Sequence, residues 1–278
     1  MIINHNLAAM NTYNQMGANA ANSSKNMEKL SSGLRINNAA DDAAGLSISE
    51  KMRAQIRGLD QASRNAQDGI SLLQTAEGGL NEAHSMLQRM RELTVQAAND
   101  TNYTEDRAAI QTELDELVTE IGNINTRTAF NKQNLLDSSA GNAGSITLQV
   151  GANSGETMVL DFAVDGINLN DIVGTDLASL SVADTATSAT ALDAIEGAIQ
   201  KVSSGRSQIG AYQNRLEHTT NNLGTSSQNL SAAESRVRDV DMAKEMMEFT
   251  KNNILNQASQ AMLSQANQQP QAVLQLLR

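Results

Sequence analysis

Two adjacent acidic residues, Asp41 and Asp42, are the first candidates for chemistry in this sequence. Paired carboxylates can act as general acid and base or can ligate a metal ion. Adjacent side chains on a helix point in different directions, so these two carboxylates would not converge on one atom. A carboxylate just before a helix instead accepts hydrogen bonds from the first free backbone N–H groups. We therefore expect Asp41 or Asp42 to cap the helix that follows.

A second acidic pair, Asp239 and Asp241, is surrounded by basic residues at positions 236, 238 and 244. This mixture of charges favours a surface network of ion pairs over a metal site. The three histidines, His5, His84 and His218, lie far apart, and none has partners at the spacing of metal ligands. A contact between His84 and His218 across two helices is conceivable, but solvated positions are the simpler interpretation.

Four methionines near the C-terminus have two interpretations. They could form an adaptable binding groove, because methionine is flexible and polarizable, or they could be ordinary residues of a helix seam. Both interpretations hold for an interface that exchanges partners. The residues are Met242, Met246, Met247 and Met262.

Other chemical signatures are missing from the sequence. It contains no cysteine, no glycine-rich phosphate loop, no nucleophile elbow and no HExxH motif. We therefore predict no enzymatic activity and no cofactor. The net charge of −11 comes with no basic patch, which disfavours a nucleic acid partner.

Composition also bounds the architecture. Only 2% of the 278 residues are aromatic, which predicts thin helix seams rather than a thick core around a pocket. No segment approaches the roughly 18 apolar residues that would span a membrane. The N-terminus lacks the basic and apolar regions of a conventional secretory signal.

The elements that must position these residues are long helices. Between residues 191 and 240 an aliphatic residue recurs every seven positions, which is typical of a helix that packs against another along its whole length. About fifty residues in one helix would extend roughly 75 Å, which indicates an elongated, coiled-coil-like body. The repeated residues are Ile195, Val202, Ile209, Leu216, Leu223, Leu230 and Val237.

A second helix is predicted from residue 43 to about residue 99. Its interruption at Gly78 and Gly79 predicts either a kink or the close approach of another backbone. A third helix, which Thr104 could cap, has apolar residues at alternating spacings of four and three. The seam residues of these two helices are Met52, Leu59, Leu73, Leu80, Leu87, Ile110, Leu114 and Leu117.

Residues 137–186 change character. Apolar residues alternate with other residues from Ile146 to Val150 and again from Met158 to Val164, with a glycine-containing turn between, which predicts a β-hairpin. Small residues at 183–191 are interpreted as a linker. The expected fold class is therefore mainly α, a long coiled-coil-like helical hairpin or bundle with a small β-hairpin in the middle of the chain.

The two ends of the chain resemble each other in composition. Residues 1–24 and 252–277 contain no charged side chain, and both have apolar residues at helical spacing. We expect residues 1–35 to pair with 240–278, and residues 43–128 with 190–237. Because such terminal helices are marginal alone, they are expected to assemble with copies of the chain.

Several long motifs resemble those of bacterial flagellin. They are MIINHNLAAMNT, LSSGLRINNAADDAAGLSISEKMRAQIRGL, LQRMRELTVQAAND, LQVGANSGE and AESRVRDVDMAKEMMEFTKNNILNQASQAMLSQANQQPQAVLQLL. The similarity covers about residues 1–165 and 185–278. It implies a secreted, extracellular subunit of the flagellar filament that is exported unfolded through the flagellar type III apparatus. A hook–filament junction protein of the same superfamily is the alternative.

The resemblance also implies a division of the chain. Residues 1–42 would form an N-terminal inner-tube helix and linker, and 238–278 the C-terminal inner-tube helix. Residues 43–136 and 187–237 would form the helical outer-tube domain, on either side of the β-hairpin region at 137–186. The residues expected to drive inner-tube assembly are Ile3, Leu7, Met10, Met247, Ile254, Leu274, Leu276 and Leu277.

The resemblance finally implies partners. These are further copies of the chain in a helical homopolymer, a flagellar export chaperone, and the filament cap and hook-junction proteins. Membrane insertion is not expected. A patch that resembles the family's innate-immune recognition site would consist of Arg89, Leu93, Gln96 and Glu113. The simpler interpretation of that patch is a contact between subunits.

Overall fold

The computed structural model describes residues 6–141, 144–178 and 180–276, with side chains as far as residue 269. It divides into two compact units, each described by itself below. The terminal unit comprises Met1–Ala54 and Asn229–Arg278, and the central unit comprises Gln55–Gln228.

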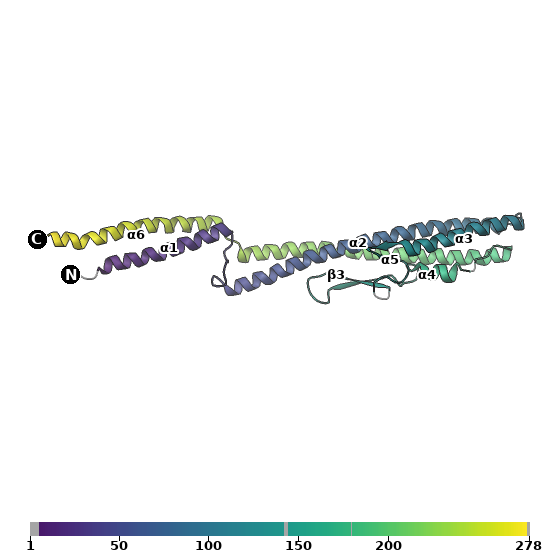
Figure 1. The fold of residues 1–278 in the computed structure, drawn as a ribbon, viewed down its shortest axis with the longest axis horizontal. Helices are drawn as coiled ribbons and strands as arrows, with labels where there is room; N and C mark the ends of the chain where they lie inside the picture. The colour runs from purple at the N-terminus through teal and green to yellow at the C-terminus, as the bar shows by residue number, and fades with distance from the viewer. Residues whose placement is uncertain (1–5, 142–143, 179, 277–278) are drawn as a thin grey trace. The chain divides into compact units, whose positions relative to one another are not determined.

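Two helices dominate the terminal unit. Helix α1 (Leu7–Ser32) and helix α6 (Met242–Leu276) lie side by side (Figure 1), as predicted from the matching ends of the chain. Asn6 caps α1 by accepting a hydrogen bond from the backbone N–H of Ala9 at 3.1 Å. Gly33 ends it in the left-handed conformation at φ 72°, which glycine adopts without steric strain.

Two acidic residues of the terminal unit, Asp42 and Asp241, are helix caps. Asp42 Oδ1 accepts from the Gly45 N–H at 2.8 Å, which confirms the expected cap of helix α2 (Ala43–Ala97). Asp241 Oδ1 accepts from the Ala243 N–H at 3.0 Å at the start of α6. Within the described residues no ion pair joins Asp239 or Asp241 to a neighbouring basic side chain. The predicted salt network is therefore wrong, because the N–H groups of the first helical turn bind Asp241 instead.

In the central unit, α2 pairs antiparallel with helix α5 (Thr185–Arg238). Ser227 donates a hydrogen bond to Asp60 at 3.0 Å, Gln213 to Glu77 at 2.9 Å, and Arg91 to Glu196 at 3.1 Å. Across these three pairs the residue number decreases along α5 as it increases along α2, so the two helices run antiparallel. The predicted pairing of the two long helices is confirmed.

Two helix starts differ from expectation. Helix α5 begins at Thr185, so the predicted linker at 183–191 is wrong. Its first turns are helical because the small residues Ser188 and Ala191 are buried there, and Ser188 Oγ donates to the Asp184 carbonyl at 2.9 Å. Helix α3 (Thr104–Arg127) begins at Thr104, one residue after its cap, Tyr103.

Two antiparallel hairpins follow α3. Strands β1 (Ala129–Phe130) and β2 (Gln133–Asn134) are joined by two residues at positive φ, Asn131 at 48° and Lys132 at 66°, which matches a tight two-residue turn. Strands β3 (Ser145–Gln149) and β4 (Thr157–Asp161) form the predicted hairpin, with Ile146 opposite Leu160. Helix α4 (Leu169–Asp171) and the π-helix η1 (Ile172–Asp176) complete the segment.

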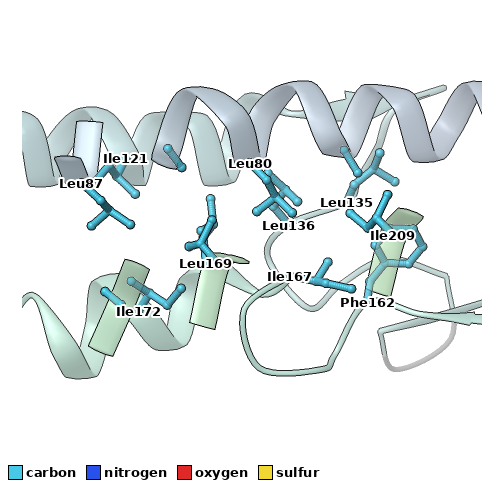
Figure 2. Packing of buried hydrophobic residues seen from close by; sticks show 14 of the residues in the cluster. Leu80, Leu87, Ile121, Leu135, Leu136, Phe162, Ile167, Leu169, Ile172 and Ile209 are labelled. Carbon is cyan, nitrogen blue, oxygen red and sulfur yellow. The ribbon is translucent and has the colours of Figure 1, made fainter. Parts of the chain in front are cut away.

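The core of the central unit is thicker than the predicted seams. Side chains from the segment between α3 and α5 pack against the long helices (Figure 2), so the scarcity of aromatic residues is compensated by leucine and isoleucine. The buried hydrophobic residues of that segment include Leu135, Leu136, Ala140, Met158, Leu160, Phe162, Ile167, Leu169, Ile172, Leu177 and Val182.

The predicted seam positions fall into two groups. The buried group is Leu73, Leu80, Leu87, Ile110, Leu114, Ile195, Val202, Ile209, Leu216 and Leu223. The half-buried group is Met52, Leu59, Leu117, Leu230 and Val237. Helix α2 continues through Gly78 and Gly79, and a Cβ atom on Gly79 would meet the side chains of Thr128 and Leu136 at 2.8 and 2.9 Å. Close approach is therefore the better of the two interpretations, although side chains rather than backbone approach.

Candidate functional site

The terminal unit holds most of the exposed large apolar side chains that the structure describes. Of fifteen such side chains, eleven lie in this unit, which marks it as an interaction surface. A shallow groove on α6 is lined by Met246, Met247 and Ile254, together with Thr250 and Lys251. The eleven residues are Leu7, Met10, Tyr13, Met27, Ile48, Met242, Met246, Met247, Ile254, Leu255 and Met262.

The contact between α1 and α6, in contrast, buries polar groups. Asn19, Asn26 and Glu245 are all buried there. With its amide oriented to satisfy its neighbours, Asn26 donates to Glu245 Oε1 at 3.0 Å and accepts from Asn252 Nδ2 at 3.1 Å. Buried polar groups of this kind fix the register of a helix pair but add less stability than apolar packing. Many of the large apolar side chains of the unit remain exposed, although Ile36 is buried.

The residues predicted for inner-tube assembly fall on this outward surface where the structure describes them. Leu7, Met10, Met247 and Ile254 are exposed. The backbone of Leu274 and Leu276 is helical within α6, but their side chains are not described. Leu277 is outside the described residues. Ile3 is also outside the described residues.

Backbone hydrogen bonds join the two chain segments that enter the terminal helices. The Arg35 N–H donates to the Arg238 carbonyl at 2.7 Å, and the Val240 N–H donates to the Gly33 carbonyl at 3.1 Å. The Arg35 guanidinium also donates to the Val237 carbonyl at 2.6 Å. These bonds hold the end of α1 beside the start of α6, so the two terminal helices begin their contact from a fixed point.

A charged patch lies on the exposed side of α2 and α3. Arg89 Nη2 donates to Glu113 Oε1 at 2.9 Å, and its Nη1 lies 3.3 Å from Glu92 Oε2. The hydrogen bond to Glu113 is the main cause that raises the pKa of Arg89 above its ordinary value. Gln96 is exposed one to two turns further along α2. Leu93 is only 3% exposed, so it lies beneath the patch rather than on it.

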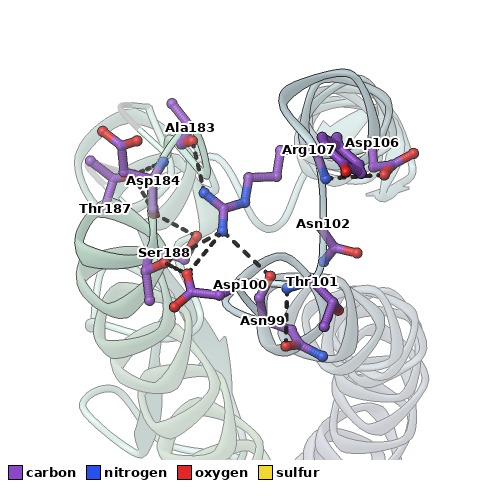
Figure 3. A network of polar contacts seen from close by, with 12 residues as sticks. Asn99, Asp100, Thr101, Asn102, Asp106, Arg107, Ala183, Asp184, Thr187 and Ser188 are labelled. Atoms are coloured by element: carbon purple, nitrogen blue, oxygen red, sulfur yellow. Dashed lines mark hydrogen bonds and ion pairs between the residues drawn. The ribbon is translucent and has the colours of Figure 1, made fainter.

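Sequence reasoning missed a second polar cluster, at the turn between α2 and α3 (Figure 3). Arg107 donates to the Ala183 carbonyl at 3.3 Å, to the Asn99 carbonyl at 3.4 Å and to Thr185 Oγ1 at 3.4 Å. Its charge is balanced by Asp100 at 3.5 Å. The guanidinium thus joins the α2–α3 turn to the start of α5. The acidic residues at the start of α3 gave no indication in the sequence that Arg107 joins these two segments.

Chemistry at the histidines receives no support. Within the described part of the chain, His84 forms a hydrogen bond with Gln88 on its own helix, at 2.9 Å, and none with His218. His5 is outside the described residues. Over the residues that the structure describes, no cluster of three potential ligands could hold a metal ion. No helix in that part of the chain is apolar enough over a sufficient length to cross a membrane.

Comparisons with known proteins point to one family. The description "Bacterial flagellin N-terminal helical region" matches residues 3–141, and "Bacterial flagellin C-terminal helical region" matches residues 192–277. A flagellin of Halalkalibacterium halodurans is 63% identical over 278 residues, covering 100% of both chains. A flagellin of Bacillus subtilis is 54% identical over 306 aligned residues, again covering 100% of both chains.

A solved structure agrees with these relatives. The crystal structure of Bacillus cereus flagellin is 35% identical to this chain, with a TM-score of 0.51. The match covers 62% of this chain and 94% of that one.

Proposed function

This chain belongs to the bacterial flagellin family, and we propose on that basis that it polymerises into the extracellular filament of the bacterial flagellum. Its role is structural, and its mechanism is self-assembly without chemical turnover. The hook–filament junction alternative is not favoured, because relatives that match over their whole length are flagellins.

The observation that carries this proposal is the exposed apolar surface of the terminal unit. Isolated soluble proteins rarely expose large contiguous apolar patches. Burial of such side chains between copies removes apolar area from water, which stabilises the polymer by about 25 cal/mol per Å². The residues that would make these contacts include Leu7, Met10, Met247 and Ile254. The proposal also assigns this role to Ile3, Leu274, Leu276 and Leu277.

The same proposal assigns the parts of the chain. Residues 1–42 and 238–278 would form the inner tube, and residues 43–136 and 187–237 the outer tube around the hairpin region at 137–186. The charge-free segments 1–24 and 252–277 suit a narrow wall, because a charge repeated in every copy would repel its neighbours. Export in an unfolded state through the flagellar type III apparatus, with an export chaperone, and contact with the cap and hook-junction proteins belong to the same proposal.

A host innate immune receptor is a further proposed partner. Its contacts would be Arg89, Gln96 and Glu113, which are exposed on α2 and α3. Leu93 would support these side chains from below, because it is buried. If neighbouring copies cover this patch in the polymer, such a receptor would bind single subunits only.

Seeded polymerisation tests the proposed function. The purified chain, mixed with short filament fragments, should give sedimenting filaments that are visible by electron microscopy. Met247→Glu should reduce the pelleted fraction strongly and leave monomer melting unchanged, because Met247 is 67% exposed.

Tyr103→Glu is the matched control, since Tyr103 is the most exposed large apolar residue of the central unit at 81%. This variant should still polymerise. Absence of filaments from the unchanged chain would refute the proposal. Equal loss in both variants would show that the terminal unit has no special role.

A further inference from the structure

Among the described methionines six are exposed, Met90 and Met158 are buried, and Met16, Met52 and Met86 are half-buried. All of the exposed methionines among the described side chains are in the terminal unit, on α1 and α6. In the central unit Met90 is 0% and Met158 is 4% exposed. The exposed residues are Met10, Met27, Met242, Met246, Met247 and Met262.

This division has a chemical consequence. A water-soluble oxidant reacts with a thioether only when the sulfur can be reached from solvent, so exposure selects which methionines are oxidised. Sulfoxide formation converts a flexible apolar side chain into a polar one and disrupts methionine-rich interfaces. In this chain, the accessible methionines are also part of the apolar surface that would be buried between copies.

We propose that these six exposed methionines are an oxidation site, and that their conversion to sulfoxides by a peroxide blocks assembly of the free subunit. The inference rests on the proposed function, since it requires the terminal unit to be buried in a polymer. Once a subunit has polymerised, its neighbours would cover the same sulfurs and protect them.

The chemical step is a two-electron oxygen transfer. The methionine sulfur attacks one oxygen of hydrogen peroxide, and a sulfur–oxygen bond forms as the oxygen–oxygen bond breaks. The other oxygen leaves as water after a proton shift, so sulfur is oxidised and the peroxide is reduced. No metal or cofactor of the protein takes part.

The surroundings of the six residues indicate that sulfoxides would be tolerated in the monomer. Their side chains are about half exposed or more, so a polar oxygen can face water without disturbing a core. The buried polar residues between α1 and α6 are Asn19, Asn26 and Glu245, which peroxide does not attack, and Met16 of α1 is half-buried and should react later than the six. Oxidation should therefore affect association of subunits and spare their fold.

The experiment compares the full chain before and after treatment with hydrogen peroxide. Mass spectrometry should find sulfoxide first at the six exposed residues and last at Met90 and Met158. Seeded polymerisation of the oxidised monomer should slow roughly tenfold or more, with unchanged monomer melting. Filaments treated in the same way should carry much less sulfoxide at the six positions.

A variant with all six residues replaced by leucine, Met10→Leu through Met262→Leu, is the matched control, because leucine has similar volume and no sulfur. It should polymerise equally well with and without peroxide. Equal loss in the variant and the unchanged chain, or no loss in either, would overturn the proposal.

Repair provides an independent measurement if the sixfold variant fails to polymerise even untreated. Methionine sulfoxide reductases of both stereospecificities, with a thiol reductant, should restore polymerisation of the oxidised unchanged chain. Failure to restore assembly after the sulfoxides have been removed would overturn the proposal. Failure of the proposed function would be visible separately, as absence of filaments before any oxidant is added.

Discussion

Two glycines of the central unit show how a single missing Cβ atom determines packing. Gly166 has φ 93°, in the region that favours glycine. A Cβ atom on Gly205, in helix α5, would collide with the Gly166 carbonyl, and one on Gly166 would collide with the Lys201 carbonyl. The loop after β4 therefore contacts the backbone of α5 directly.

Gly205→Ala should consequently lower the free energy of unfolding by about 1–3 kcal/mol, because backbone must move to admit the methyl group. Gly197 and Gly210 lie in the same helix with nothing within 4 Å of an added Cβ atom. Alanine there should raise the free energy of unfolding by about 0.5–1 kcal/mol. Chemical denaturation measures all three variants. The packing argument fails if Gly205→Ala is as stable as Gly197→Ala.

The pH dependence of the loop before α2 follows from Asp41. Hydrogen bonds from the N–H groups of Asn38 and Asn37, at 3.0 and 3.2 Å, lower the pKa of Asp41 below its ordinary value of 3.8. The ionised carboxylate is therefore favoured by folding. Its contribution to stability is present above pH 3.8 and is lost as the pH falls through the lower folded value.

An NMR titration of the side-chain carboxyl should accordingly give a midpoint below 3.8 for Asp41, with the Asn37 and Asn38 amide protons shifting in parallel. Asp41→Asn should remove these shifts at low pH. A midpoint at or above 3.8 would contradict this explanation.

At the scale of elements, the start of α5 depends on one guanidinium. The Arg107 side chain is only 12% exposed and donates to two carbonyls and to a hydroxyl group across three segments. A lysine ammonium is a single point and cannot reach all three acceptors in this geometry.

Arg107→Lys should therefore leave a carbonyl unpaired and destabilise the central unit by about 1–3 kcal/mol. Hydrogen exchange should accelerate at the first turns of α5, from Thr185 to Ala191. Arg127→Lys is the control, because Arg127 is an exposed residue at the end of the same helix. Equal exchange rates at Thr185–Ala191 in the two variants would remove the proposed role of Arg107.

The long helices were predictable from sequence because one simple period specifies them. Aliphatic residues every seven positions define α5, and Asp42 marks the start of α2. The start of α5 was not predictable, because Thr, Ser and Ala at 185–191 carry no seam and become helical through tertiary contacts. The turn at Asn131 and Lys132 was missed because it contains no glycine, although both residues adopt positive φ.

The candidate sites were predictable to a similar degree. Leu7 and Met247 are exposed, and their assignment to a surface that needs other copies stays a prediction. Burial of Leu93 was not foreseen. On α2 the residues Met90, Leu93, Thr94 and Ala97 are all buried, a wider stripe than a two-helix seam requires. Because α2 is covered by more than one element there, a single heptad pattern could not indicate it.

At the scale of the whole molecule, the buried apolar cluster and most of the exposed large apolar side chains that the structure describes lie in different units. The buried apolar cluster runs from Ala66 to Leu216 and lies wholly within the central unit. The terminal unit instead holds polar contacts between α1 and α6 and an exposed apolar surface. A protein organised in this way can keep a folded body while its terminal helices exchange partners.

Deletion of residues 259–278 should therefore abolish filament formation and shift melting of the central unit little. The deletion removes the end of α6, including the Ala266 carbonyl that accepts from Asn6 at 2.8 Å, but no residue of the buried cluster. It also removes Met262 and the terminal leucines, which would contact neighbouring copies. Seeded polymerisation with sedimentation measures assembly, and calorimetry measures folding. Pelletable filaments from the shortened chain would show that this segment is dispensable, whereas loss of the central transition would show that α6 stabilises the body.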